Sequence, residues 1–339
     1  MNIDRRTFFQ RTGLTGLSLL ALGSSPERAA ADPDPAPEGK GAHPAADSVM
    51  DPEIFQFRLG DLEAFIVHDG FLGLPSVQPT FVPEAKPAEI EELFKRQFLP
   101  PNRVALSLNV LIVKTKSGVI LFDSGAGHAF GPSMGHLLRG LAKLGIKPGD
   151  VKAIFVTHAH ADHIGGLVSE SNEPVFGAAR IVAARKEVEF WTSSDPDLSG
   201  VRTPLETKTQ SLRAIQKFLG GVKGNLDLRE PGRISPEVEL VASPGHTPGH
   251  SGFRVSGGEE TLLVIGDSVH LYALQFPHPE WTMAYDVHPD QAIITRRKLF
   301  EQASAERTLL MGYHLPFPGV GHVKMEGPGY IWVPRPWVV

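Results

Sequence analysis

Short apolar runs alternate with segments of helical spacing along most of this 339-residue chain. The runs are nearly uninterrupted and rich in β-branched residues, which is typical of buried strands. They lie at 108–113, 119–122, 151–156, 181–183, 238–241, 261–265 and 308–311. Residues 55–59 and 62–67 flank Gly60-Asp61 and predict a hairpin. Apolar residues at helical spacing predict helices over 86–98, 134–144, 210–219 and 290–303.

The first 31 residues follow a different pattern. A twin-arginine pair with aromatics, Asp4 to Gln10, precedes a mildly apolar run at 12–23 and the small residues Ala29-Ala30-Ala31. This order is that of a cleavable export signal, and the apolar run is too short to cross a bilayer. The arginine pair predicts a bacterial protein exported by the twin-arginine machinery to the periplasm or the medium. A retained N-terminal anchor helix is the alternative.

The amino-acid composition indicates the domain organisation and excludes some kinds of metal ligand and binding partner. Residues 32–50 are rich in Pro, Gly and Ala and predict a disordered linker, which leaves 51–339 as one folded domain. The absence of cysteine excludes disulfides and thiolate ligands. The first 31 residues carry four Arg, one Asp and one Glu, so their removal shifts the formal net charge from −5 to −7. An acidic chain without basic runs argues against nucleic-acid binding, and no other segment predicts stable membrane anchoring.

Four residues that commonly bind metals fall within six positions directly after the apolar run 151–156. They are His158, His160, Asp162 and His163. Imidazole and carboxylate groups suit zinc and neighbouring divalent ions. On an extended strand His158 and His160 share one face, because side chains alternate with a period of two. The stretch therefore predicts a metal site; the alternative is a histidine-rich surface turn in which Asp162 is an ordinary helix cap.

The stretch 158–163 resembles the signature of the metallo-β-lactamase superfamily of hydrolases. Three more motifs match that family in order: Pro244–His250, Gly266-Asp267 after an apolar strand, and Gly312-Tyr313-His314. The resemblance implies an α/β (α+β) fold, namely a four-layer αβ/βα sandwich with the metal site at one edge. It also implies a possible homodimer.

The same resemblance implies two divalent metal ions, with Zn expected first and Mn, Fe or Co as alternatives. It divides the donors into His158, His160 and His246 for one ion, Asp162, His163 and His314 for the other, and Asp267 as the bridge. Such a pair of ions supplies hydroxide near neutral pH for attack on a carbonyl carbon or a phosphorus. Asp162, His270 or Tyr285 is expected to pass a proton to the leaving group.

Several residues near these motifs are interpreted as supports or as ordinary structure. Asp123, in an Asp-x-Gly element, is expected to support the metal site from behind, with turn initiation as the alternative. His250 and His322 are interpreted as structural or as supports of the ligands, because every ligand position is already filled.

Further motifs resemble the methyl parathion hydrolase group, which contains phosphotriesterases and related lactone and aryl-ester hydrolases. They lie at 129–132, 186–191, 275–276, 314–322 and 326–330. His270 and Tyr285 depart from the apolar residues of the phosphotriesterase. Both can donate a hydrogen bond to a substrate carbonyl or leaving oxygen, and a buried donor without a partner is costly. A lactone or aryl ester is therefore the expected substrate, unless these two side chains point away from the pocket.

The remaining expectations concern the pocket and rival activities. Phe130 and Trp191 are expected to form an aromatic wall, with a plain core role as the alternative.

An organophosphate hydrolase of the methyl parathion type is the second candidate function. A β-lactamase is disfavoured by Asp267, because that branch lacks a bridging carboxylate. A glyoxalase II-like thioesterase is disfavoured because no basic glutathione-binding segment is found.

Overall fold

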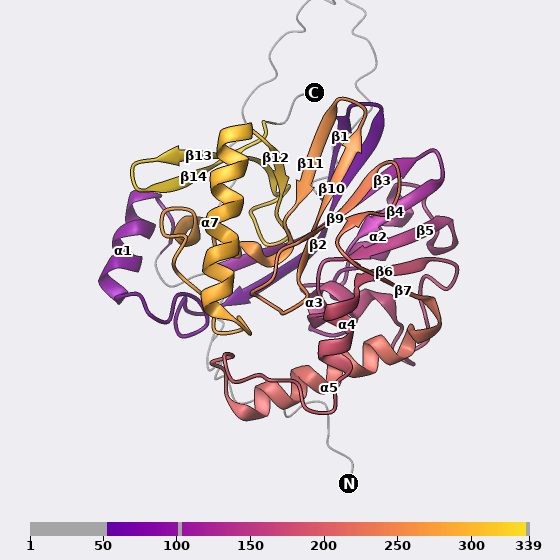
Figure 1. Ribbon diagram of the computed structural model, residues 1–339, viewed down its shortest axis with the longest axis horizontal. Helices are drawn as coiled ribbons and strands as arrows, with labels where there is room; N and C mark the ends of the chain where they lie inside the picture. Colours follow the sequence, from indigo (N-terminus) through magenta and orange to yellow (C-terminus); the bar gives the residue numbers. More distant parts are fainter. Residues whose placement is uncertain (1–52, 101–103, 337–339) are drawn as a thin grey trace, which may run out of the picture. The chain divides into compact units, whose positions relative to one another are not determined.

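The computed structural model describes residues 53–100 and 104–336, and these residues form two β-sheets flanked by helices (Figure 1). The predicted export signal at 1–31 and the linker at 32–50 lie outside the described residues. Within the described part of the chain, no helix is both long and apolar enough to cross a membrane.

Each sheet has seven described strands. The first contains, in spatial and chain order, β1 (Ile54–Leu59), β2 (Leu62–Leu74), β3 (Val104–Thr115), β4 (Gly118–Phe122), β5 (Val151–Val156), β6 (Arg180–Ala184) and β7 (Leu226–Arg229). It is antiparallel from β1 to β4 and parallel from β4 to β7. The second, in the spatial order β14 to β8, contains β8 (Gly232–Arg233), β9 (Val238–Ala242), β10 (Ser251–Gly257), β11 (Glu260–Val264), β12 (Leu309–Met311), β13 (Val320–Glu326) and β14 (Gly329–Pro334).

The central strands are buried on both faces, which explains their continuous apolar sequence. In β3, Leu111 and Val113 face the second sheet, whereas Val110 and Ile112 face the helices. Aromatic rings of Phe122, Phe155 and Phe253 meet between the sheets with centroids 5.2–5.6 Å apart. The alternation with a period of two thus supplies two separate cores from one strand.

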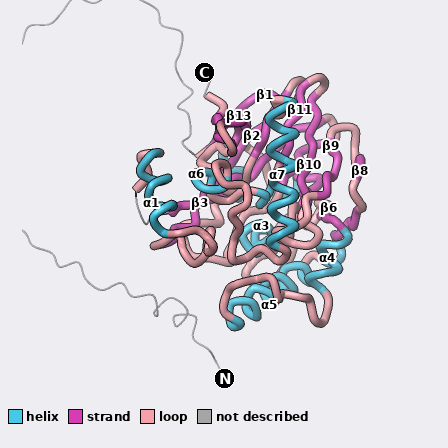
Figure 2. Tube along the Cα trace, turned by 60° about the vertical axis from the view of Figure 1, so that its left-hand side comes forward, coloured by secondary structure: helices cyan, strands magenta, loops and turns pink. Residues whose placement is uncertain are grey.

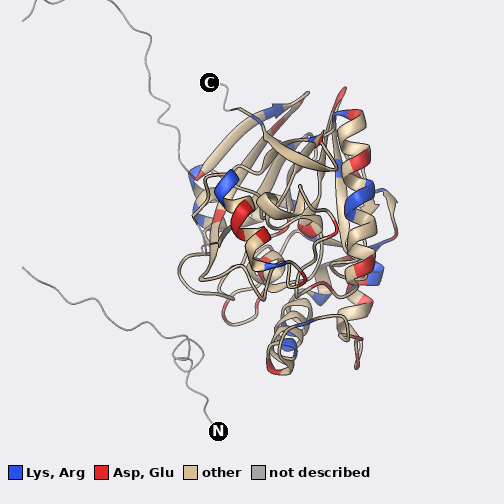
Figure 3. Ribbon diagram, turned by 90° about the vertical axis from the view of Figure 1, so that its left-hand side faces the viewer, with Lys and Arg blue, Asp and Glu red and all other residues tan. Residues whose placement is uncertain are grey.

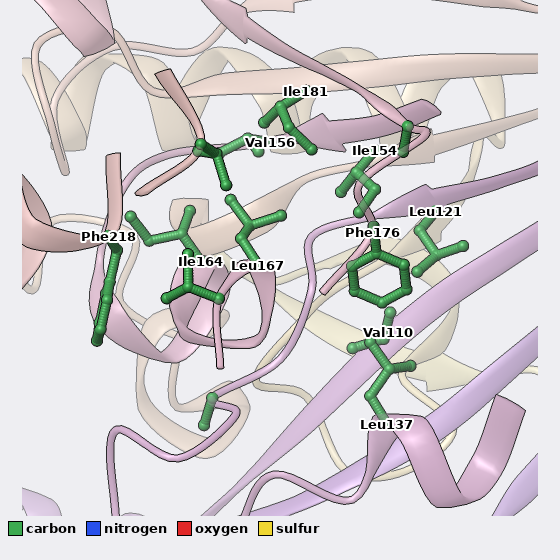
Figure 4. Close-up of a cluster of buried hydrophobic side chains, with 14 of the residues drawn as sticks. Val110, Leu121, Leu137, Ile154, Val156, Ile164, Leu167, Phe176, Ile181 and Phe218 are labelled. Atoms are coloured by element: carbon green, nitrogen blue, oxygen red, sulfur yellow. The ribbon is translucent and has the colours of Figure 1, made fainter. Parts of the chain in front are cut away.

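Seven helices accompany the sheets in the described residues. They are α1 (Pro87–Arg96), α2 (Leu137–Lys143), α3 (Ala161–Ile164), α4 (Arg185–Thr192), α5 (Leu205–Gly221), α6 (Tyr272–Gln275) and α7 (Pro289–Glu306). Figure 4 shows Leu137, Ile164 and Phe218, from α2, α3 and α5, together with side chains of the first sheet. Phe300 and Ala303 of α7 pack against the outer face of the second sheet, beside which α7 runs in Figure 2. The predicted four-layer sandwich is confirmed.

Some elements differ from the sequence prediction. Helix α5 begins at Leu205 rather than near 210, and α4 was not predicted. The first turns of both helices consist mostly of charged and polar residues, which dilute the apolar pattern. Figure 3 shows the same mixture on the long upright helix α7, where Lys, Arg, Asp and Glu alternate along its surface.

Candidate metal centre

The predicted metal ligands come together where strands of both sheets end. His158 and His160 follow β5, and α3 begins directly afterwards and carries Asp162 and His163. The second sheet contributes three side chains from separate connections. His246 lies between β9 and β10, Asp267 follows β11, and His314 follows β12. All seven predicted ligands therefore lie in one place.

The first group consists of three imidazoles. His160 Nδ1 lies 3.0 Å from His158 Nε2 and 2.9 Å from His246 Nε2. Burial is the main cause that lowers the pKa of His158 well below its usual value and the pKa of His160 to about 3. The rings of His158 and His160 are therefore neutral at physiological pH and offer lone pairs, as metal ligands require.

The second group contains a carboxylate and two imidazoles. Asp162 Oδ2 lies 3.3 Å from His314 Nε2 and 3.7 Å from His163 Nε2. Asp267 reaches both groups: its Oδ1 is 3.1 Å from His163 Nε2, and its Oδ2 is 3.4 Å from His246 Nε2. Asp267 therefore occupies the bridging position between the two groups.

Two buried polar atoms at the centre show that the site fits metal ions. Among the described residues, His163 Nε2 and Asp267 Oδ1 have no hydrogen-bond partner, since the 3.1 Å contact between them lacks hydrogen-bond geometry. Buried polar atoms are rarely left unpaired in folded proteins. The ligand atoms of each group lie within 4.8 Å of one another, and a set of imidazoles and carboxylates suits divalent cations. The donors present therefore fit two such ions.

Electrostatics at the second group also favours a cation. Burial lowers the pKa values of His163 and His314, but nearby carboxylates outweigh it. Asp267 and Asp162 raise the pKa of His314 to about 9. In the absence of metal, protons would occupy these rings, so metal binding must release them.

Asp123 and His250 support the ligands from behind. Asp123 accepts hydrogen bonds from the Thr157 amide and hydroxyl at 2.7 and 2.8 Å, and its Oδ2 is 2.8 Å from His163 Nδ1. His250 Nε2 accepts from the Asp267 amide at 2.9 Å, and its Nδ1 lies 2.9 Å from the Ser243 carbonyl oxygen. Asp123 therefore orients His163, and His250 orients the bridging Asp267.

Asp286 was missed by the sequence analysis. Its Oδ1 lies 2.8 Å from His246 Nδ1, and its Oδ2 accepts from the Met283 amide at 2.8 Å. This arrangement holds the His246 proton on Nδ1 and leaves Nε2 free to bind metal. Asp286 lies 40 residues from His246, so no local motif could identify it.

A cavity of about 160 Å³ opens onto the metal ligands. Its apolar lining consists of Leu72, Leu74, Phe81, Leu106, Phe130, Ala161, Ile215 and Met283. His270 and Tyr285 also line it, so neither points away from the pocket. Phe130 lies in the wall with 39% of its surface exposed, as expected for a substrate contact.

Trp191 is placed differently from the sequence expectation. It is 2% exposed and is not part of the cavity lining. Its ring packs behind His160 with centroids 5.6 Å apart, and its indole N–H donates to Glu187 at 2.8 Å. Trp191 therefore supports a ligand from behind, because its one polar group is already engaged inside the protein.

The two polar pocket residues also differ from each other. His270 Nε2 lies 2.9 Å from Asp267 Oδ2, so this nitrogen faces the bridging carboxylate rather than the space for a substrate. Burial lowers the pKa of His270 to about 4. Tyr285 is half-buried, and its hydroxyl makes no hydrogen bond with the described residues. Tyr285 is therefore the better placed donor for a substrate.

Comparison with known proteins agrees with this geometry. A sequence model described as the metallo-beta-lactamase superfamily matches residues 104–314, which contain all seven predicted ligands. The chain belongs to this superfamily.

Members of the superfamily with similar structures or sequences include lactonases. The structure of AidC, a dizinc quorum-quenching lactonase in complex with a product N-hexanoyl-L-homoserine, is 32% identical. The similarity covers 84% of this chain and 98% of AidC, with a TM-score of 0.81. An N-acyl homoserine lactonase of Bacillus cereus is 25% identical over 186 residues, which cover 49% of this chain and 65% of the lactonase.

A probable metallo-hydrolase of Mycobacterium bovis is likewise 25% identical over 186 residues, or 49% of this chain. The match spans 58% of the length of that relative. The superfamily match and the donor set thus agree: the chain belongs to the metallo-beta-lactamase superfamily and carries residues that fit two divalent metal ions.

Proposed function

We propose that this protein is a two-metal hydrolase that opens lactones carrying an apolar substituent. The observation that carries the proposal is the position of seven metal donors beside a largely apolar cavity that is also lined by Tyr285, whose hydroxyl makes no hydrogen bond with the described residues. The similarity to AidC, whose structure contains an N-acyl homoserine product, supports the same substrate class.

Each group of donors has a distinct role in this proposal. His158, His160 and His246 would hold one divalent ion, and Asp162, His163 and His314 the other, with Asp267 between them. Two bound divalent ions supply Lewis acidity and make hydroxide available near neutral pH.

The cavity wall orients the substrate and excludes water. Leu72, Phe81 and Met283 offer apolar surface to an acyl or aryl substituent, and burial of that surface favours binding by about 25 cal/mol per Å². The reacting lactone carbonyl would then lie towards the metal ligands at His160 and Asp162. A long apolar substituent should therefore improve binding over an unsubstituted lactone.

Tyr285 provides the proton in this scheme. When the acyl carbon–oxygen bond of a lactone breaks, its electron pair stays on the ring oxygen as an alkoxide. The Tyr285 hydroxyl gives its proton to that oxygen, and the tyrosinate regains a proton from water. Burial and the nearby Asp162 raise the pKa of Tyr285 above its usual value, yet a phenol remains a stronger acid than an alcohol. Asp162 is a weaker candidate, because His163 and His314 hold its pKa below the usual value in spite of burial.

A phosphotriesterase or aryl esterase is the second candidate function. The apolar walls and Phe130 suit an aromatic leaving group, and the motifs resembling the methyl parathion hydrolase group support it. A phenolate departs without a proton, so this chemistry would make no use of Tyr285. β-Lactamase and thioesterase activities are less favoured, because Asp267 takes the bridging position and the cavity wall is apolar.

The test compares kcat/KM on four substrates for the metal-loaded enzyme: a long-chain acyl-homoserine lactone, dihydrocoumarin, phenyl acetate and methyl paraoxon. Zn, Mn and Co are supplied in turn, and a His160→Ala variant controls for contaminating activity. The proposal expects the two lactones to exceed both other substrates at least tenfold. A preference for methyl paraoxon would contradict it and favour the second candidate.

A further inference from the structure

A buried carboxylate, that of Glu187, lies outside the metal ligands and outside the cavity. It is 1% exposed, sits in the first turn of α4, and has no Lys or Arg partner among residues 53–100 and 104–336. An unpaired charge in such a place is costly unless several donors satisfy it. Burial raises the pKa of Glu187, and four hydrogen bonds oppose that rise.

Those four donors come from three separate parts of the metal centre. Oε1 accepts from the Ala159 amide at 2.9 Å and from the indole N–H of Trp191 at 2.8 Å. Oε2 accepts from the Thr247 hydroxyl at 2.6 Å and from the Gly249 amide at 3.1 Å. The Glu187 carboxylate thus links the loop after β5 in the first sheet to the loop between β9 and β10 in the second.

The positions of these donors relative to the ligands are specific. Ala159 is the residue between His158 and His160, and Thr247 directly follows His246. All three ligands of the first group therefore sit beside a Glu187 contact. The second group has no such contact: Asp123 orients His163, and His314 Nδ1 lies 3.0 Å from the Ser107 carbonyl oxygen.

Helix α4 and the loop that carries His246 approach each other closely because residue 249 is glycine. A Cβ atom at Gly249 would lie 2.1 Å from the backbone nitrogen of Glu187, so only glycine allows this contact. Replacement of Glu187 by glutamine would place an amide donor where a carboxylate oxygen now accepts. Thr247 can turn its hydroxyl to accept instead, but the Gly249 amide cannot.

We propose that Glu187 is a positioning residue that fixes the spacing of the three-histidine group and so sets the affinity of the ion held there. The inference rests on the proposed metal centre, and it assigns control of one of the two ions to a residue that contacts neither. Groups that orient ligands typically change metal affinity by about 10- to 100-fold. The affinity of the ion held by Asp162, His163 and His314 should stay unchanged.

The test measures stepwise Co²⁺ binding by absorption against a competing chelator in wild type, Glu187→Gln and Glu189→Gln. Glu189 is exposed on the same helix and serves as the matched control. A His160→Ala variant identifies the step that belongs to the three-histidine group. We expect Glu187→Gln to weaken that step alone, by at least 10-fold. Equal weakening of both steps, or wild-type affinity in both, would overturn the proposal.

A second readout does not depend on metal. Hydrogen exchange of the metal-free protein, followed in peptides covering 157–163 and 245–251, should be faster in Glu187→Gln. Trp191→Phe removes one hydrogen bond but leaves the link between the loops, so it should keep slow exchange in both peptides. Unchanged exchange in Glu187→Gln would refute the loop link. Faster exchange without two-ion binding in wild type would instead refute the proposed metal function.

Discussion

At the scale of single residues, Tyr285 separates the two candidate functions. Replacement of Tyr285 by phenylalanine should lower kcat/KM for an acyl-homoserine lactone by about 100-fold or more, because the alkoxide loses its proton donor. The same variant should lose only a few-fold on 4-nitrophenyl acetate, whose phenolate leaves without a proton. Tyr272→Phe, outside the cavity lining, is the control. Equal losses on both substrates would contradict the assigned role.

Asp69 gives a pH-dependent prediction away from the metal ions. Burial raises its pKa to about 6, although the amides of Ala126, Gly135 and Leu137 donate to its carboxylate and partly oppose the rise. A carboxyl group whose pKa is raised in the folded state stabilises the protein fully below its unfolded value near 4. This contribution is lost as the pH rises through 6.

The free energy of unfolding of wild type, relative to Asp69→Asn, should therefore fall by about 2 kcal/mol between pH 4 and 7. Urea unfolding of the two proteins across this range measures the difference. Asp61→Asn, at an exposed turn, should show no such trend. A difference that is constant with pH would show that Asp69 keeps its ordinary pKa.

At the scale of elements, one buried cation connects α7 to the segment that carries the pocket residues. Arg296 is 1% exposed and donates to the carbonyl oxygens of Ser268, Pro279 and Trp281 at 2.6–2.9 Å. Arg296→Leu should lower the free energy of unfolding by about 3 kcal/mol or more, because three buried acceptors lose their partner. Arg297→Leu, whose side chain is exposed, should change it by less than about 0.5 kcal/mol. Denaturant unfolding of both variants checks this.

The elements that could be predicted from sequence are those with a strong local pattern. Strand β5 is an apolar run buried on both faces, and the residues after it form a compact ligand motif. Helix α4 has only eight residues, and among its buried residues is the charged Glu187. Its pattern is therefore too short and too polar to show a helix, and the role of its carboxylate depends on loops that meet only in the fold.

The supporting residues of the site were harder to predict than its ligands. Asp286 and Glu187 act through partners 40 and 60 residues away, so nothing in their neighbourhood marks them. Trp191 was expected in the pocket wall but packs behind His160 outside the cavity lining, because sequence does not show which way the side chains of α4 point.

At the scale of the whole molecule, the first 31 residues carry a separate prediction. We propose that the twin-arginine pair directs export, so Arg5→Lys with Arg6→Lys should leave the protein in the cytoplasm of a bacterial host. Fractionation followed by immunoblotting measures the distribution, and a variant that changes only Arg11 is the control. Normal export of the double variant would exclude this route.

The metal centre joins the two halves of the sandwich. His158, His160, Asp162 and His163 follow the first sheet, whereas His246, Asp267 and His314 come from the second. Bound ions would therefore connect both halves, and they would stabilise the folded protein in proportion to their affinity. The proposed activity likewise depends on both halves at once.

The most direct test of a two-metal lactone hydrolase is turnover of a long-chain acyl-homoserine lactone as metal is titrated into the metal-free protein. Bound metal per chain is measured in parallel by mass spectrometry. We predict that activity rises until two ions are bound per chain and then stays constant. Full occupancy by two ions without lactone turnover, or full turnover with one ion, would contradict the account.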